Sequence, residues 1–312
     1  MLTIGESFLS PRRILNIIRN MQSKNFEKHL KIAIVLTSIF FVVEIVGGLI
    51  SGSLSLLGDA GHMLRDVFAL LISLSALNIS KKLPSKRKTF GFHRVEIFAA
   101  FLNGILLIAI GLWILLEAYH RFHSPKPIES TTMLIVALIG LGINLYVAFK
   151  LHGSHDLNIK SAFLHVLTDA IFSFAVVLAA VMIFLTENTI FDPILSSIIS
   201  VVIILSASKL MKESIMILLE FTPKDVNFDL VMRDIQQVDG VQGVHNVHIW
   251  SLCSSINVMD AHVYTKETDM MKIEKIKNEI KKKLVKYNIK HATLEFECEE
   301  CILPDKVERI DH

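Results

Sequence analysis

The chain has 312 residues, of which 52% are hydrophobic and 20% are charged, and its formal net charge is +2. Its mean hydropathy of +0.52 is high for a soluble protein. This composition excludes a purely soluble enzyme, a disordered chain and a disulfide-rich scaffold. The charge is unevenly spread, because residues 1–213 carry 19 Lys and Arg against 13 Asp and Glu, whereas residues 214–312 carry 13 against 17. The basic residues of the first part lie between apolar segments, so they indicate membrane topology and not binding to nucleic acid.

Six apolar segments are each close to the roughly 20 residues that a helix needs to cross a bilayer core. They span about 32–50, 55–79, 96–119, 131–150, 161–186 and 191–211. Lys and Arg gather before the first segment, after the second and fourth, and at the end of the last. The positive-inside rule therefore predicts cytoplasmic N- and C-termini. We expect a cytoplasmic N-terminal segment over 1–30 and a six-helix transmembrane domain over 31–213.

Residues 214–312, here called the tail, have the composition and periodicity of a small α+β domain. Apolar residues recur at helical spacing over 226–237 and 270–286. They alternate, as in half-buried strands, over 244–251, 257–264 and 291–298. We expect the tail to form a separate cytoplasmic domain.

The cysteines and the N-terminus bear on the compartment. Three cysteines, with only Cys298 and Cys301 close together, fit a reducing environment better than a disulfide framework. Residues 1–28 hold several bases but no apolar run of the signal-peptide type, so no cleaved leader is expected.

Ionisable residues occur inside only three of the predicted spans, the first, second and fifth. A charge at the middle of a bilayer costs about 2.5–3.5 kcal/mol even on the most lenient scale, so such residues are candidates for a function. Glu44 stands alone on its span, and we expect it to be a packing or hydration residue. The others are Asp59, His62, Arg65, Asp66, His165 and Asp169.

One unit occurs twice among these residues, as His62-x-x-x-Asp66 and as His165-x-x-x-Asp169. Residues four apart lie on one face of a helix, so two facing units would offer two imidazoles and two carboxylates. That set suits tetrahedral Zn²⁺ and lacks the thiolates that Cu(I) prefers. Mg²⁺ and Ca²⁺ prefer oxygen ligands, so two imidazoles make the set a poor site for either. A single pair would equally fit a buried hydrogen bond or a proton relay, but the repetition favours a metal site.

Four motifs resemble the cation diffusion facilitator family, and most closely its zinc-transporting branch. They are SLSLLGDAGHMLRD at 53–66, GFHRVEIFAAFLN at 91–103, DLNIKSAFLHVLTD at 156–169 and VHNVHIWS at 244–251. The resemblance runs from about residue 30 to residue 300. It implies six transmembrane helices with a cytoplasmic ferredoxin-like α+β domain, a homodimer, and export of a divalent metal from the cytosol in exchange for protons.

The resemblance also implies roles for individual residues. It assigns His62, Asp66, His165 and Asp169 to the transport site, and His at the first position accompanies a preference for zinc. Arg94 and Glu220 lie where the family has an interlocking charge network at the dimer interface, although two solvated charges would contribute only about 0–1 kcal/mol.

This sequence departs from the family pattern at Arg65, in the connection 151–160, and at the loop metal site of some bacterial members, near which only His93 remains. Arg65 stands where a small polar residue is expected, and we interpret it as a cation that pairs with Asp59 or reaches the membrane surface. The connection 151–160 holds only His152 and His155, so the long His-rich loop of some eukaryotic relatives is missing. Its absence favours a bacterial cytoplasmic membrane.

A proton-coupled mechanism follows from the chemistry of the ligands. A metal ligand must be deprotonated, so metal binding releases protons and protonation releases the metal. Histidine titrates near physiological pH and is the natural proton carrier. We therefore expect Zn²⁺ and H⁺ to be exchanged at one fixed site that faces the two sides in turn.

The tail holds further candidate metal ligands, of which we expect His245, His262 and Glu297 to bind zinc as a regulatory ion. Strict strand alternation predicts that His245 and His248 face opposite sides of the sheet. Cys298-x-x-Cys301 has zinc-like spacing, but the pair requires at least two more ligands. In zinc-transporting relatives such a pair can join ligands from the partner's N-terminal segment, where this chain has only His29.

Three other functions fit parts of the pattern. An antiporter for Mn²⁺, Co²⁺, Ni²⁺ or Cd²⁺ would use similar ligands. A non-transporting membrane sensor or partner subunit would use the tail while the membrane site stays idle, and Arg65 is the feature that favours it. An intramembrane metallohydrolase would need an open metal position, which four protein ligands do not leave, so we do not expect an enzyme.

Overall fold

The computed structural model describes residues 38–79, 85–151, 157–254 and 256–298. The chain forms two compact units, one made of residues 1–70 and 107–205 and the other of residues 71–106 and 206–312. Each unit is described separately below.

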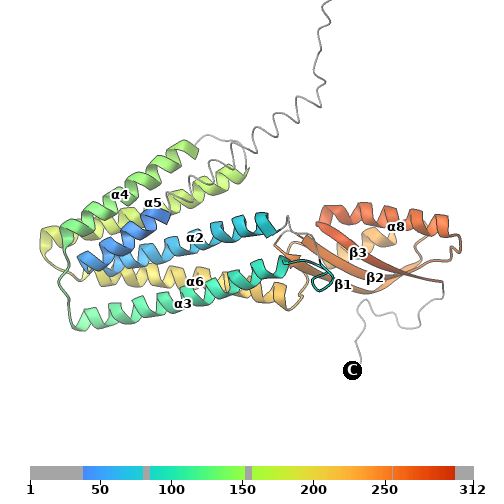
Figure 1. Ribbon diagram of the computed structural model, residues 1–312, viewed down its shortest axis with the longest axis horizontal. Coiled ribbons are helices and arrows are strands. Elements are labelled where there is room, and N and C mark those ends of the chain that lie inside the picture. Colours follow the sequence, from blue (N-terminus) through green and yellow to red (C-terminus); the bar gives the residue numbers. More distant parts are fainter. Residues whose placement is uncertain (1–37, 80–84, 152–156, 255, 299–312) are drawn as a thin grey trace, which may run out of the picture. The chain divides into compact units, whose positions relative to one another are not determined.

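Long helices account for the first two thirds of the described chain (Figure 1). A helix over Ser38–Ser51 precedes α2 (Leu54–Ile79), α3 (His93–His123), α4 (Ser130–Leu151), α5 (Leu157–Thr186) and α6 (Phe191–Leu218). The predicted segments agree with these bounds, but α3, α5 and α6 extend several residues further, because their polar ends also adopt helical backbone. Within the described residues, four helices are long and apolar enough to cross a membrane, namely α3, α4, α5 and α6. The count of six spans stays a prediction.

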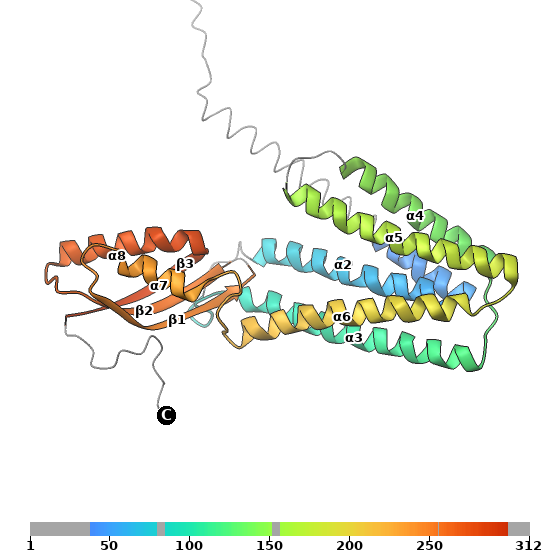
Figure 2. The same ribbon diagram turned by 180° about the vertical axis from the view of Figure 1, so that it is seen from behind.

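Helices of the first unit approach one another closely at glycines. A Cβ on Gly140 of α4 would lie 2.3 Å from the ring of Phe40, and a Cβ on Gly111 of α3 would lie 2.7 Å from the side chain of Ile204 on α6. Small residues allow such contacts between membrane helices, where packing and not the hydrophobic effect holds helices together. Helices α4 and α5 also lie side by side in both views (Figures 1 and 2).

A buried polar network joins one end each of α2, α3 and α6. The carboxylate of Asp192 accepts hydrogen bonds from the hydroxyls of Ser53 and Ser55, at 2.7 and 2.6 Å, and from the backbone N–H groups of Leu54 and Ser55, at 2.8 and 2.9 Å. Arg121 Nη1 lies 3.6 Å from Asp192 Oδ2. Because the first N–H groups of a helix lack partners within the helix, Asp192 of α6 caps the N-terminus of α2.

The tail is an α+β domain, as expected. Its elements are α7 (Phe228–Gln236), β1 (Gly243–Cys253), β2 (Ile256–Tyr264), α8 (Met270–Leu284), a short 3-10 turn (Val285–Tyr287) and β3 (Ile289–Glu297). The sheet order is β1-β2-β3, with β1 and β2 antiparallel and β2 and β3 parallel. Helices α7 and α8 pack on one face of this sheet (Figure 2), and one apolar core fills the space between them.

Strand β1 contains a β-bulge that changes the direction of its side chains. His245 pairs with His262 and His248 with Asp260, so two residues of β1 stand opposite one residue of β2. Asn246 has a positive φ of 47°, which asparagine tolerates better than most residues. As a result Val244 and Val247, three apart, both belong to the core. His245 and His248 therefore lie on the same face of the sheet, and the prediction from strict alternation is wrong.

Candidate metal sites

The two His-x-x-x-Asp units lie on α2 and α5, and the structure brings one member of each together. His62 Nε2 of α2 lies 3.6 Å from Asp169 Oδ1 of α5, and the two side chains are 12% and 21% exposed. The rings of His62 and Phe172 also form a T-shaped contact, with ring centroids 5.4 Å apart. The structure does not describe the side chains of Asp66, His165 and Arg65. The other two ligands and the role of Arg65 thus stay predictions.

A pair of acidic residues is buried in the same unit. Glu44 and Asp59 are only 1% and 4% exposed, and their carboxyl groups lie close enough to influence each other electrostatically. Ser173 Oγ of α5 donates to Asp59 Oδ2 at 3.3 Å, and Asn144 Nδ2 of α4 donates to Ser173 Oγ at 3.1 Å. The sequence alone predicts no partner for Glu44, because Asp59 belongs to another helix.

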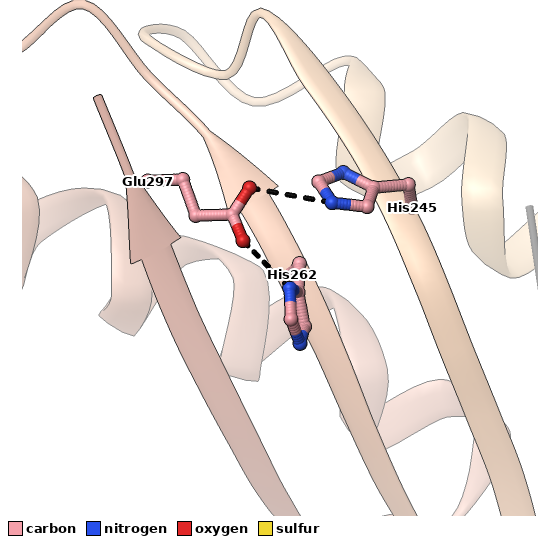
Figure 3. Close-up of side chains that lie close together, drawn as sticks. All are labelled: His245, His262 and Glu297. Carbon is pink, nitrogen blue, oxygen red and sulfur yellow. Dashed lines mark hydrogen bonds and ion pairs between the residues drawn. The ribbon is translucent and has the colours of Figure 1, made fainter. Parts of the chain in front are cut away.

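The tail brings together His245 of β1, His262 of β2 and Glu297 of β3 (Figure 3). His262 Nδ1 lies 2.7 Å from Glu297 Oε1, and His245 Nε2 lies 3.3 Å from Glu297 Oε2. The two histidines are directly opposite each other in the register, and their ring centroids are 5.2 Å apart. One donor atom from each residue can be chosen so that all three lie within 4.8 Å of one another.

The donor set of this cluster, here called the tail site, fits a divalent metal. Two imidazoles and one carboxylate form a three-ligand set that leaves a fourth position of zinc open. His245 Nε2 is buried and lies 3.3 Å from Glu297 Oε2 without forming a hydrogen bond. A cation between these side chains would bind both atoms.

The cysteines give no second cluster among the described residues. Cys298 is exposed just after β3, Cys253 is buried in β1, and neither forms a disulfide with a described residue. Cys301 lies outside the described residues, as does His29. Metal binding by Cys298 and Cys301 therefore stays a prediction.

Arg94 and Glu220, which belong to one unit, form an ion pair. Arg94 Nη2 at the start of α3 donates to Glu220 Oε1 just after α6, and the side chains are 43% and 54% exposed. The structure therefore brings the two residues together. A role for the pair in a dimer interface stays a prediction.

The exposure of this pair limits its effect on folding. Exposed ion pairs contribute about 0–1 kcal/mol, so Arg94→Ala should lower the free energy of unfolding by less than about 1 kcal/mol. Thermal unfolding of the purified chain in detergent tests this, with Lys224→Ala, which breaks an exposed pair with Glu213, as the matched control. A much larger loss for Arg94→Ala would point to a network that extends beyond this pair.

Two family models match the chain in succession. The model described as "Cation efflux transmembrane domain" matches residues 30–219, and the model described as "Cation efflux protein, cytoplasmic domain" matches residues 223–298. The match covers both the long helices and the α+β tail.

Curated relatives cover most of the chain. It is 36% identical over 278 residues to a Bacillus subtilis protein named "Cadmium, cobalt and zinc/H(+)-K(+) antiporter", covering 88% of this chain and 89% of that one. It is 38% identical over 293 residues to the Escherichia coli protein named "Zinc transporter ZitB", covering 92% of each. It is also 38% identical to a Cupriavidus metallidurans protein named "Metal cation efflux system protein CzcD", covering 91% of each. The chain therefore belongs to the cation efflux (cation diffusion facilitator) family, in its zinc-transporting branch.

Proposed function

We propose that this chain exports Zn²⁺ from the cytosol in exchange for protons, by alternating access to one site within the membrane. The observation that carries the proposal is the approach of His62 on α2 to Asp169 on α5, 3.6 Å apart. Each belongs to a His-x-x-x-Asp unit, and Asp66 and His165 lie one helical turn away on the same two helices. The proposed ligand set is therefore two imidazoles and two carboxylates, which suits tetrahedral zinc.

Proton coupling follows from the ligands themselves. The imidazole of His62 binds a metal only when its ligating nitrogen carries no proton, so zinc and protons compete for it. Ligands from two helices also allow alternating access, because a small shift of α2 against α5 separates His62 from Asp169. The names of the relatives support this proposal, since they include a zinc transporter and a metal/H(+)-K(+) antiporter.

The proposed arrangement in the cell follows the distribution of charge. Residues 1–30 and the tail from residue 214 lie in the cytoplasm, and residues 31–213 form six spans in a bacterial cytoplasmic membrane. The chain acts as a homodimer, in which Arg94 and Glu220 lie close to the interface. The match of the tail to a cytoplasmic domain of cation efflux proteins is consistent with this arrangement.

Flux into proteoliposomes tests the function. Zinc uptake should rise with an imposed pH gradient and stop when a protonophore collapses it, and a potassium gradient alone should drive less uptake. Protein-free vesicles under the same gradient are the control for leakage. Zinc flux that ignores the pH gradient would refute proton exchange, and zinc binding without flux would instead support a membrane sensor.

Other divalent metals are alternative substrates, which we rank below zinc. The Bacillus subtilis relative is named for cadmium and cobalt as well as zinc. We propose that zinc is preferred here, because imidazole and carboxylate ligands in a tetrahedral set suit it. Competition of each metal against zinc uptake in the same vesicles measures the preference.

The tail site is proposed to bind zinc as a regulatory ion. Glu297→Gln keeps the shape of the side chain but removes the charge that lies near both His245 and His262. We expect zinc affinity at this site to fall at least about tenfold, since even residues behind the ligands contribute 10–100-fold. Zinc titration of full-length Asp169→Ala, in which the transport site is disabled, measures it. Glu267→Gln, which alters a carboxylate in the loop before α8, is the matched control and should bind as the parent does.

A further inference from the structure

The side chain of Asn246 links the tail site to a histidine that does not belong to it. Asn246 Nδ2 lies 3.4 Å from His262 Nε2, and Asn246 Oδ1 lies 2.9 Å from His248 Nε2. Both contacts depend on the β-bulge, which places His248 on the same face as His245. The other nitrogen of His262, Nδ1, lies 2.7 Å from Glu297 Oε1. Each nitrogen of His262 therefore has a partner.

The polarity of this chain of hydrogen bonds is fixed at one end. The carboxylate of Glu297 only accepts, so in the neutral ring of His262 the proton lies on Nδ1 and Nε2 is left as an acceptor. The amide N–H of Asn246 then donates to His262 Nε2, and Asn246 Oδ1 accepts from the N–H of His248 Nε2. All donors and acceptors match in the absence of metal.

A metal at the tail site reverses this polarity. If the metal takes Nδ1 of His262, the neutral ring must carry its proton on Nε2, which then faces the amide N–H of Asn246. Rotating the amide by half a turn presents Oδ1 to His262 and Nδ2 to His248. His248 Nε2 must then accept, so its proton moves to Nδ1. Both rings stay neutral, and the number of protons on them does not change.

A competing acceptor for His262 is present but distant. Glu295 Oε2 lies 3.7 Å from His262 Nε2, beyond hydrogen-bonding distance, and this side chain is 69% exposed. Asn246 is closer and is held by the bulge. We propose that Asn246 is a positioning residue that sets the tautomer of His262. Through Asn246, the tautomer of His248 then depends on whether a metal occupies the tail site. This proposal rests on the tail site binding metal, as proposed above.

Two substitutions separate this role from a structural one. Both glycine and aspartate tolerate the positive φ of residue 246, so neither should disturb the bulge. Asn246→Gly removes the amide and should weaken zinc binding at the tail site about 10–100-fold. Asn246→Asp offers only acceptors, which favours a proton on His262 Nε2 and a free Nδ1. We therefore expect it to bind zinc as tightly as the parent or more tightly.

The measurement uses the full chain with Asp169→Ala, in detergent, titrated with zinc against a chelator. Selective ¹⁵N labelling of histidine reports the tautomers directly. In the parent, zinc should change which ring nitrogen carries the proton in His262 and in His248. Asn246→Gly should abolish this change at His248. Equal weakening by both substitutions, or a His248 tautomer that ignores zinc, would overturn the relay. If His262→Ala left zinc binding unchanged, the tail site itself would be wrong.

Discussion

Replacing Asp169 by alanine is expected to lower the initial rate of gradient-driven zinc uptake at least about 100-fold. The substitution removes one of the four proposed ligands and leaves His62 without the carboxylate that lies 3.6 Å away. Changes to residues that merely support metal ligands cost 10–100-fold, so loss of a ligand should cost more. Uptake by proteoliposomes under a fixed pH gradient measures the effect.

A matched control separates loss of the site from loss of folding. Glu129→Ala removes an exposed acidic residue just before α4 and should transport at the rate of the unaltered chain. Asp169→Asn keeps the size of the side chain and should recover little of the flux, because the amide has no negative charge. If Asp169→Ala kept more than about a tenth of the uptake, Asp169 would not be a ligand of the transport site.

Asp192→Ala is expected to cause the largest loss of stability. It would leave the N-terminus of α2 uncapped, remove four hydrogen bonds to a buried carboxylate, and leave Glu117 as the remaining carboxylate that pairs with Arg121. Removing one partner of a buried charged network costs about 3–5 kcal/mol. The midpoint of thermal unfolding in detergent should therefore fall by at least about 6 °C.

Graded substitutions check that the network is the cause. Asp192→Asn keeps one oxygen that can accept from Ser55 or Leu54, so it should lose less than the alanine variant. Ser197→Ala, on the same helix but bonded only to the carbonyl of Pro193, should lose least. An Asp192→Ala chain that unfolds at the unaltered temperature would mean that water accepts the hydrogen bonds that the carboxylate accepts in the unaltered chain.

The apolar segments and the tail strands could be predicted because each depends on local pattern. The cluster of His245, His262 and Glu297 was predicted, and alternation correctly gives the face on which His262 and Glu297 lie. The bulge was not, because it depends on how β1 pairs with β2 and on the backbone of Asn246.

Contacts between helices were the hardest features to predict. Glu44 meets Asp59, and Asp192 caps α2, across 15 and more than 130 residues of chain. No periodicity within a single helix signals such pairs. Both pairs can be identified only once the packing of the helices is known. Both consist of polar groups that would be costly in contact with lipid.

Asp192 holds the first turn of α2 in place by capping it, so any tilt of this helix turns about that end. With a rise of about 1.5 Å per residue, His62 lies about 12 Å from that point. A tilt of only about 1° then displaces His62 by about 0.2 Å, which is the tolerance of metal–ligand distances. If His62 binds the metal as proposed, coordination would respond to rotations of α2 too small to require any repacking of its capped end.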